Sequence, residues 1–177
     1  MRGYFGIGVE GISKSMNVGN LIRSAHAFGA SFVFTIDAHP KAGRAPSDTS
    51  KTYTQLPFYQ WPSITEMELP IDCQLVGVES LDEAIDLPSF RHPLRAAYVF
   101  GPERGSLSPE MLSLCTQTVK IPTSFCINVA TAGSIIMYDR TISMGRFAER
   151  PVMAGQIPEP LEPHVSGGPV LRTKRRQ

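Results

Sequence analysis

The fold of this chain is decided by the stretch Ala96-Ala97-Tyr98-Val99-Phe100-Gly101-Pro102-Glu103-Arg104-Gly105. Its first half is largely apolar, as expected of a buried β-strand, and its second half is a turn with two glycines, a proline and a carboxylate. Turns at the carboxyl ends of strands are where open α/β sheets bind ligands. Glycine lets a ligand approach the backbone there, and Pro102 stiffens the turn. An ordinary strand-to-helix turn has the same composition, so the interpretation depends on the rest of the chain.

Strand and helix signals alternate along the sequence. Short runs of apolar and β-branched residues predict strands over residues 4–9, 31–36, 74–78, 96–100 and 118–121. Helices are predicted to begin at Asn17, at Ser108-Pro109 and at Asn128, the last of them running to Phe147. Residues 38–52 are polar and contain glycine and proline, which predicts a long loop. This alternation predicts an α/β fold with a mostly parallel sheet flanked by helices.

The first predicted helix carries a notable arginine. Asn17 is a good N-cap residue, and Gly29 supplies a stop. The apolar stripe of this helix consists of Val18, Leu21, Ile22, Ala25 and Phe28. Arg23 lies outside that stripe, so we expect it to project toward solvent or a cleft.

Composition restricts the class of protein. The 177 residues suffice for one well-packed domain, and 42% hydrophobic with 19% charged residues is typical of a globular chain. We expect no signal peptide, because the first four residues lead directly into a predicted strand with no apolar h-region. We also expect no membrane association, because no apolar stretch is long enough to span a bilayer. The three cysteines form no CxxC pair, which favours a reducing cytoplasmic location and leaves zinc or an iron–sulfur cluster without ligands. We therefore expect no metal.

The net charge of +1 conceals an asymmetry. Residues 149–177 contain five Lys or Arg and three Glu, together with five prolines, and end in Lys174-Arg175-Arg176-Gln177. Such a segment cannot bury enough surface to order itself, so we predict a globular domain over 1–148 and a disordered, proline-rich basic tail over 149–177. A basic tail of this kind either adds phosphate contacts to RNA or simply solubilises the chain.

A second glycine pattern suggests a different class. Residues 6–11, Gly-Ile-Gly-Val-Glu-Gly, match the GxGxxG pattern of a dinucleotide site, and Asp37 closes the second predicted strand. However, only five residues precede Gly6, and the helical pattern begins only near Asn17. A Rossmann-type NAD-dependent oxidoreductase therefore remains an alternative, but the glycines fit the interior of a strand better.

Three segments together resemble a known family. They are Asn17-Val18-Gly19-Asn20-Leu21-Ile22-Arg23, the turn at residues 101–105, and Ile121-Pro122 followed by Cys126-Ile127-Asn128-Val129. In this order and spacing they resemble the SpoU/TrmH family of the SPOUT class of RNA methyltransferases. The resemblance extends over residues 5–147, which is nearly the whole predicted domain.

The resemblance implies a fold and an activity. Members of the family have an α/β sheet whose C-terminal part forms a trefoil knot, an exception to the rule that chains are unknotted. They bind S-adenosylmethionine in the knot, act as homodimers with sites built from both chains, and methylate the 2′-hydroxyl of a ribose in RNA. Little chain precedes Asn17, and small members of this kind tend to act on tRNA, so we expect tRNA rather than rRNA as substrate.

The resemblance also implies site residues. Those matching catalytic positions are Asn17, Arg23, Glu103 and Asn128. Those matching cofactor-binding positions are Val78, Gly101, Ile121, Cys126 and Ala130, with Cys126 standing where the family usually has serine. We expect Arg23 to stabilise charge on the 2′-oxygen rather than act as a base, since an arginine side chain stays protonated at neutral pH. Glu103 is expected to orient donors. A non-catalytic RNA-binding protein of the same fold is the alternative, and retention of all four catalytic positions argues against it.

Overall fold

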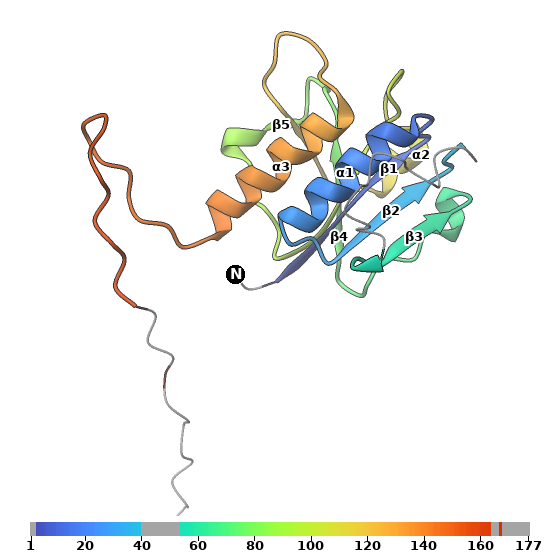
Figure 1. Cartoon of the computed structure of the whole chain (residues 1–177). Helices are drawn as coiled ribbons and strands as arrows, with labels where there is room; N and C mark the ends of the chain where they lie inside the picture. The colour runs from blue at the N-terminus through green and yellow to red at the C-terminus, as the bar shows by residue number, and fades with distance from the viewer. Residues whose placement is uncertain (1–2, 40–53, 164–166, 168–177) are drawn as a thin grey trace, which may run out of the picture. The chain divides into compact units, whose positions relative to one another are not determined.

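The strand that precedes the Gly101 turn lies in the middle of a parallel sheet. The computed structural model describes residues 3–39, 54–163 and 167 (Figure 1). Within these residues the strands form one sheet in the order β3-β2-β1-β6-β4-β7-β5. Their bounds are β1 (Tyr4–Glu10), β2 (Phe32–Ile36), β3 (Phe58–Trp61), β4 (Gln74–Val78), β5 (Ile85–Asp86), β6 (Arg95–Phe100) and β7 (Gln117–Lys120). All neighbouring pairs run parallel, which confirms the mostly parallel sheet.

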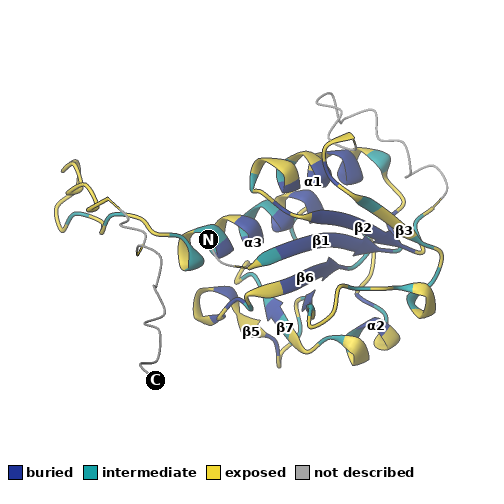
Figure 2. Ribbon diagram, turned by 90° about the horizontal axis from the view of Figure 1, so that it is seen from below, coloured by how far each residue is buried: buried dark blue, intermediate teal, exposed yellow. Residues whose placement is uncertain are grey.

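Helices cover both faces of this sheet (Figure 2). Helices α1 (Ser15–Ala27) and α3 (Val129–Met144) lie side by side on one face, and α2 (Pro109–Leu114) lies on the other. Two 3-10 turns, η3 (Ile64–Glu66) and η4 (Leu87–Ser89), complete the described elements. Strand β2 is buried throughout, as parallel strands with two covered faces must be. The α/β prediction is confirmed.

The glycines of β1 serve packing between strands. A Cβ on Gly6 would lie 2.2 Å from the ring of Phe32, and one on Gly8 would lie 2.3 Å from the ring of Phe34. Both phenylalanines come from β2, which pairs with β1 in the register Gly6–Phe32 and Gly8–Phe34. Because these glycines lie inside a strand and not in a strand-to-helix turn, the GxGxxG pattern lacks the structural context of a dinucleotide site.

Two of the three predicted helix starts are confirmed. The Ser108 hydroxyl accepts the N–H of Met111 at the start of α2, and Asn128 Oδ1 accepts the N–H of Ala130 at the start of α3. The cap of α1 was predicted wrongly. That helix begins two residues earlier than expected, after Lys14, and Asn17 lies inside it with a side chain that bonds other segments.

Helix α3 contributes a buried cation near the amino end of the sheet. Arg140 is only 1% exposed. Its guanidinium donates to the carbonyls of Pro93 (2.6 Å), Leu94 (3.0 Å) and Tyr4 (3.3 Å). It also donates to the Tyr98 hydroxyl at 3.0 Å. Since Tyr4 begins β1 and Leu94 precedes β6, this one side chain joins the starts of two neighbouring strands to α3.

Contacts divide the chain into two units, residues 1–145 and 146–177. The described part of the second unit, residues 146–163 and 167, contains no helix or strand. Within it, Arg146 donates to the Glu162 carbonyl at 3.0 Å. Residues 164–166 and 168–177 of the predicted tail lie outside the described residues, as do residues 40–52 of the predicted loop.

Candidate functional site

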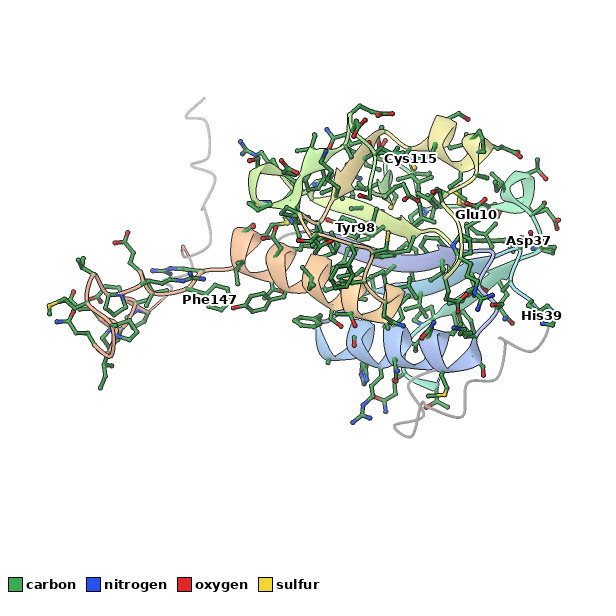
Figure 3. All side chains as sticks on the ribbon, turned by 90° about the horizontal axis from the view of Figure 1, so that it is seen from above. Glu10, Asp37, His39, Tyr98, Cys115 and Phe147 are labelled. Carbon is green, nitrogen blue, oxygen red and sulfur yellow. The ribbon has the colours of Figure 1, made fainter. Side chains whose placement is uncertain are left out.

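The carboxyl ends of the central strands surround a cavity of about 400 Å³. Its wall is built from the end of β4, the turn after β6, the segment after β7 and the residues at the start of α1. Glu10 is the last residue of β1, and Asp37 directly follows β2. Figure 3 shows both residues at this same end of the sheet. In parallel sheets this end is the one at which ligands bind, so the turn at residues 101–105 has the location expected for a site.

Glu103 is the centre of a hydrogen-bond network on the cavity wall. Its carboxylate accepts the backbone N–H of Lys14 at 3.0 Å and the side-chain amide of Asn17 at 3.0 Å. It also accepts the backbone N–H and the hydroxyl of Ser13 at 3.3 and 3.2 Å. These bonds fix the turn after β6 to the start of α1, although the two segments lie far apart in sequence.

The network extends to the third segment through two asparagines. Asn128 Nδ2 donates to Asn17 Oδ1 at 3.0 Å, while Asn17 Nδ2 donates to Glu103. Asn128 Oδ1 accepts the N–H of Ala130 and so caps α3. Three of the four predicted catalytic residues, Asn17, Glu103 and Asn128, are thus brought together, and all three line the cavity.

The surroundings of Glu103 favour its ionised form. Partial burial acts to raise the pKa of this carboxyl, but hydrogen bonds from its own backbone, from Ser13, from Asn17 and from Lys14 outweigh burial and lower it. A carboxylate that is ionised and already accepts several donors is suited to holding them in place. That Glu103 orients donors and does not act as a base stays a prediction.

Two further carboxylates hold the same turn, and sequence analysis missed both. Glu79, just after β4, accepts the N–H of Leu107 at 2.8 Å, and Glu10, at the end of β1, accepts the N–H of Ser108 at 2.9 Å. Close packing accompanies these bonds, because a Cβ on Gly101 would lie 2.8 Å from the Leu107 nitrogen. The signal available in the sequence was the position of each Glu at the carboxyl end of a parallel strand.

Four of the five predicted cofactor contacts line the cavity, namely Val78, Gly101, Ile121 and Cys126. The fifth, Ala130, is not among the lining residues; it is 7% exposed and lies in the first turn of α3. Cys126 is exposed. Among the residues that the structure describes, no group of three or more His, Cys, Asp or Glu could hold a metal ion.

Arg23 lies apart from this cluster within a single chain. It is an exposed residue of α1 and is not among the cavity-lining residues. The neighbouring residues Leu21 and Ile22 are buried in the core instead. The prediction that Arg23 projects from α1 is confirmed, but its own chain does not bring it to the cavity wall.

Comparison with known proteins identifies the family. The model of the SpoU rRNA Methylase family matches residues 5–138, which include Arg23, Glu103 and Asn128. This chain belongs to the SpoU rRNA methylase family. The match therefore confirms the resemblance that the three segments indicated. A comparison with curated proteins finds no match.

Three solved structures share the fold of this chain. The AdoMet complex of the SpoU methyltransferase AviRb from Streptomyces viridochromogenes has a TM-score of 0.71 and 24% identity, over 82% of this chain and 60% of that chain. An AdoMet-bound rRNA methyltransferase from Sinorhizobium meliloti has a TM-score of 0.72 and 17% identity, over 82% and 59%. A structure described as concerning the 2-OH methylation of C/U34 on tRNA has a TM-score of 0.69 and 21% identity, over 81% and 92%.

These matches differ in how much of each relative they cover. This chain spans about 60% of the length of the AviRb and Sinorhizobium proteins, but 92% of the protein described for C/U34 on tRNA.

Among the described residues, no helix is both long and apolar enough to cross a membrane.

Proposed function

We propose that this chain transfers a methyl group from S-adenosylmethionine to a ribose 2′-hydroxyl in RNA. The observation that carries the proposal is the network of Asn17, Glu103 and Asn128, which joins the three family segments around one cavity. The position of the cavity at the carboxyl ends of parallel strands supports it, as does membership of the SpoU family.

The volume of the cavity is suited to a small-molecule cofactor such as S-adenosylmethionine. Its volume of about 400 Å³ falls within the range of roughly 300–1,000 Å³ typical of small-molecule sites. Val78 and Ile121 would supply apolar contacts and backbone groups, and Gly101 would expose the backbone of the turn. S-adenosylmethionine supplies a methyl group on a sulfonium, so the protein has mainly to align it with an oxygen nucleophile.

Arg23 is proposed to act on the 2′-oxygen from a second copy of the chain. Its exposure on α1 and its absence from the cavity wall of its own chain support a homodimer in which each site receives the partner's arginine. Exposed apolar side chains on α3, Tyr138 and Ile142, also favour an interface there. The arginine would stabilise negative charge on the 2′-oxygen and bind the adjacent phosphate, while the hydroxyl proton leaves to water or to a phosphate oxygen.

A knotted C-terminal part belongs to the same proposal. The segment after β4 and the end of β7 are held together, because Glu79 donates its N–H to the Val119 carbonyl at 3.0 Å. Lys120 Nζ donates to the carbonyls of Leu81 and Asp82, both at 3.0 Å. The proposed knot requires these two segments to lie close together, and the contacts support it in that respect.

We favour tRNA over rRNA as the substrate. The support is coverage: the solved structure described for tRNA methylation is matched over 92% of its length, whereas the rRNA methyltransferase is matched over 59%. A cytoplasmic location fits three free cysteines, Cys73, Cys115 and Cys126.

Nucleoside mass spectrometry on total tRNA and rRNA from a gene-deletion strain tests this function. We expect one 2′-O-methylated nucleoside to be missing from tRNA and to be restored by the purified chain with S-adenosylmethionine. Methylation of rRNA alone would correct the substrate, and methylation of a base would overturn the ribose assignment. RNA binding without S-adenosylmethionine binding in calorimetry would identify a non-catalytic RNA-binding protein instead, and binding of NAD an oxidoreductase.

A further inference from the structure

Lys14 differs in charge from the other side chains that line the cavity. Among the described lining residues it is the only lysine or arginine, whereas two carboxylates, Glu79 and Glu103, lie in the same wall. Neither carboxylate forms an ion pair with Lys14. The family segments do not include this residue, since the first of them begins at Asn17.

The backbone of Lys14 is fixed, but its ammonium group is free. Its N–H donates to Glu103 at 3.0 Å, and its carbonyl accepts the N–H of Asn17 at 3.0 Å and of Val18 at 3.3 Å. The side chain is exposed, and its Nζ makes no hydrogen bond or ion pair with any residue that the structure describes. A fixed Cα therefore holds an unpartnered cation at the rim of the cavity.

Lys120 shows what a lysine with a structural role looks like in this chain. Its Nζ donates to two backbone carbonyls, those of Leu81 and Asp82. Lys14 has no such partners among the described residues. A structural role of its ammonium group therefore does not explain why a lysine is found at this position.

We propose that Lys14 binds a phosphate of the RNA substrate beside the acceptor ribose and so positions that ribose at the mouth of the cavity. The proposal rests on the proposed function. A phosphate that approaches this wall meets the negative charges of Glu79 and Glu103, and a cation at the rim offsets their repulsion. Lysine suits the role because its ammonium is a compact charge on a flexible stem and needs no fixed bidentate geometry.

Direct RNA binding tests this role independently of turnover. The probe is fluorescein-labelled total tRNA from the gene-deletion strain, and the readout is fluorescence anisotropy at several salt concentrations with S-adenosylhomocysteine present. We expect Lys14→Gln to raise the Kd for tRNA about five- to tenfold and to lower the slope of log Kd against log salt by about 1, as loss of one phosphate contact requires. Lys14→Arg should restore most of the binding and the slope.

A matched control and a second ligand separate the possible outcomes. Arg91→Gln removes another exposed cation, at the other end of the sheet near the start of β6, and should change neither quantity. The Kd for S-adenosylmethionine should stay within about twofold in Lys14→Gln. A rise in that Kd with unchanged tRNA binding would mean that Lys14 binds the cofactor carboxylate, which overturns the proposal, and so would an unchanged salt slope. If the wild-type chain binds tRNA but methylates none, the proposed function is overturned. The Kd for tRNA of Lys14→Gln can still be compared with that of the wild type in that case, so the two failures are distinguishable.

Discussion

The two ends of the sheet place polar side chains in opposite settings. At the carboxyl end, Asn17, Glu103 and Asn128 form a network on the wall of an open cavity. At the amino end, Arg140 lies in a closed cluster in which Tyr98 is fully buried and accepts one of its bonds. The first network leaves polar atoms beside a space that a ligand can fill. In the second, both terminal guanidinium nitrogens of Arg140 donate to protein atoms, and only its Nε is left without a partner among the described residues.

The closed cluster extends through a histidine. His92 Nδ1 lies 2.6 Å from the Tyr98 hydroxyl, and its Nε2 lies 2.9 Å from Asp139. Burial raises the pKa of Tyr98 to about 12, which keeps its hydroxyl protonated as a hydrogen-bond donor and acceptor. From this difference we expect the network at the carboxyl end to serve the proposed function and the cluster at the amino end to serve stability.

The largest effect should come from breaking the amino-end cluster. Arg140→Met fills a similar volume but removes the donors that Arg140 now supplies to the Pro93 carbonyl and the Tyr98 hydroxyl. Buried acceptors that lose their partners cost about 1–3 kcal/mol each, so we expect the free energy of unfolding to fall by about 3–5 kcal/mol. Urea unfolding followed by circular dichroism measures this. The Kd for S-adenosylmethionine, measured at a temperature where the variant is folded, should be unchanged. A large change in that Kd would show that the amino-end cluster also affects the cavity.

For Arg23→Lys we expect the reverse pattern, in which catalysis is impaired and stability is unchanged. The side chain is exposed, so the free energy of unfolding should change by less than about 0.5 kcal/mol. Lysine keeps the charge but loses the planar fork, and we expect kcat to fall about 100-fold, the usual cost of removing a donor to a developing oxyanion. Single-turnover methylation of tRNA measures it. Near-wild-type transfer would remove Arg23 from the mechanism.

A smaller effect is expected at the carboxyl end for Glu103→Gln. Glutamine offers one acceptor oxygen and a donor amide in place of a carboxylate that accepts from Ser13, Lys14 and Asn17. We expect the Kd for S-adenosylmethionine to rise about tenfold, equivalent to about 1.4 kcal/mol. Calorimetric titration measures it, with Glu83→Gln as an exposed control outside the cavity wall. Equal affinities in the two variants would show that the network does not support the site.

The smallest expected effect is a pH dependence confined to the amino end. Burial lowers the pKa of His92 from its ordinary 6.5, against the opposing influence of Asp139. The unfolded chain therefore binds a proton more readily, and the stabilising contribution is complete above pH 6.5 and lost as pH falls from there through the folded-state pKa. His92→Asn should flatten the pH dependence of the free energy of unfolding between about pH 5 and about pH 8. An unchanged profile would assign that dependence to other groups.

Sequence patterns predicted the strands with buried apolar runs and the cap of α2. The end of β4 and the Ser108 cap are examples, because each depends on local residues. Hydrogen bonds between segments far apart in sequence were not predicted. The sequence shows that Glu10 and Glu79 each follow a predicted strand, but only the sheet order shows that both strands lie beside the segment after β6.

The same reason explains two other failures. Arg140 carried no prediction, because nothing near it in sequence shows that it is buried and donates to the Tyr98 hydroxyl and to the carbonyls of Tyr4, Pro93 and Leu94. Asn17 has the residue type of an N-cap, but its amide is used by Glu103 and Asn128, which lie 86 and 111 residues away. Partners so distant in sequence leave no local signal.

The place of β1 in the sheet bears on the order in which the chain can fold. One edge of β1 pairs with β2, which follows shortly in sequence, but the other pairs with β6 in the register Tyr4–Arg95 to Val9–Phe100. During synthesis, that second edge stays unpaired until about 90 more residues have been made. Completion of the sheet is therefore a late, non-local event with a high entropic cost of closure, and nascent chains that end before β6 should be prone to aggregate through the open edge of β1.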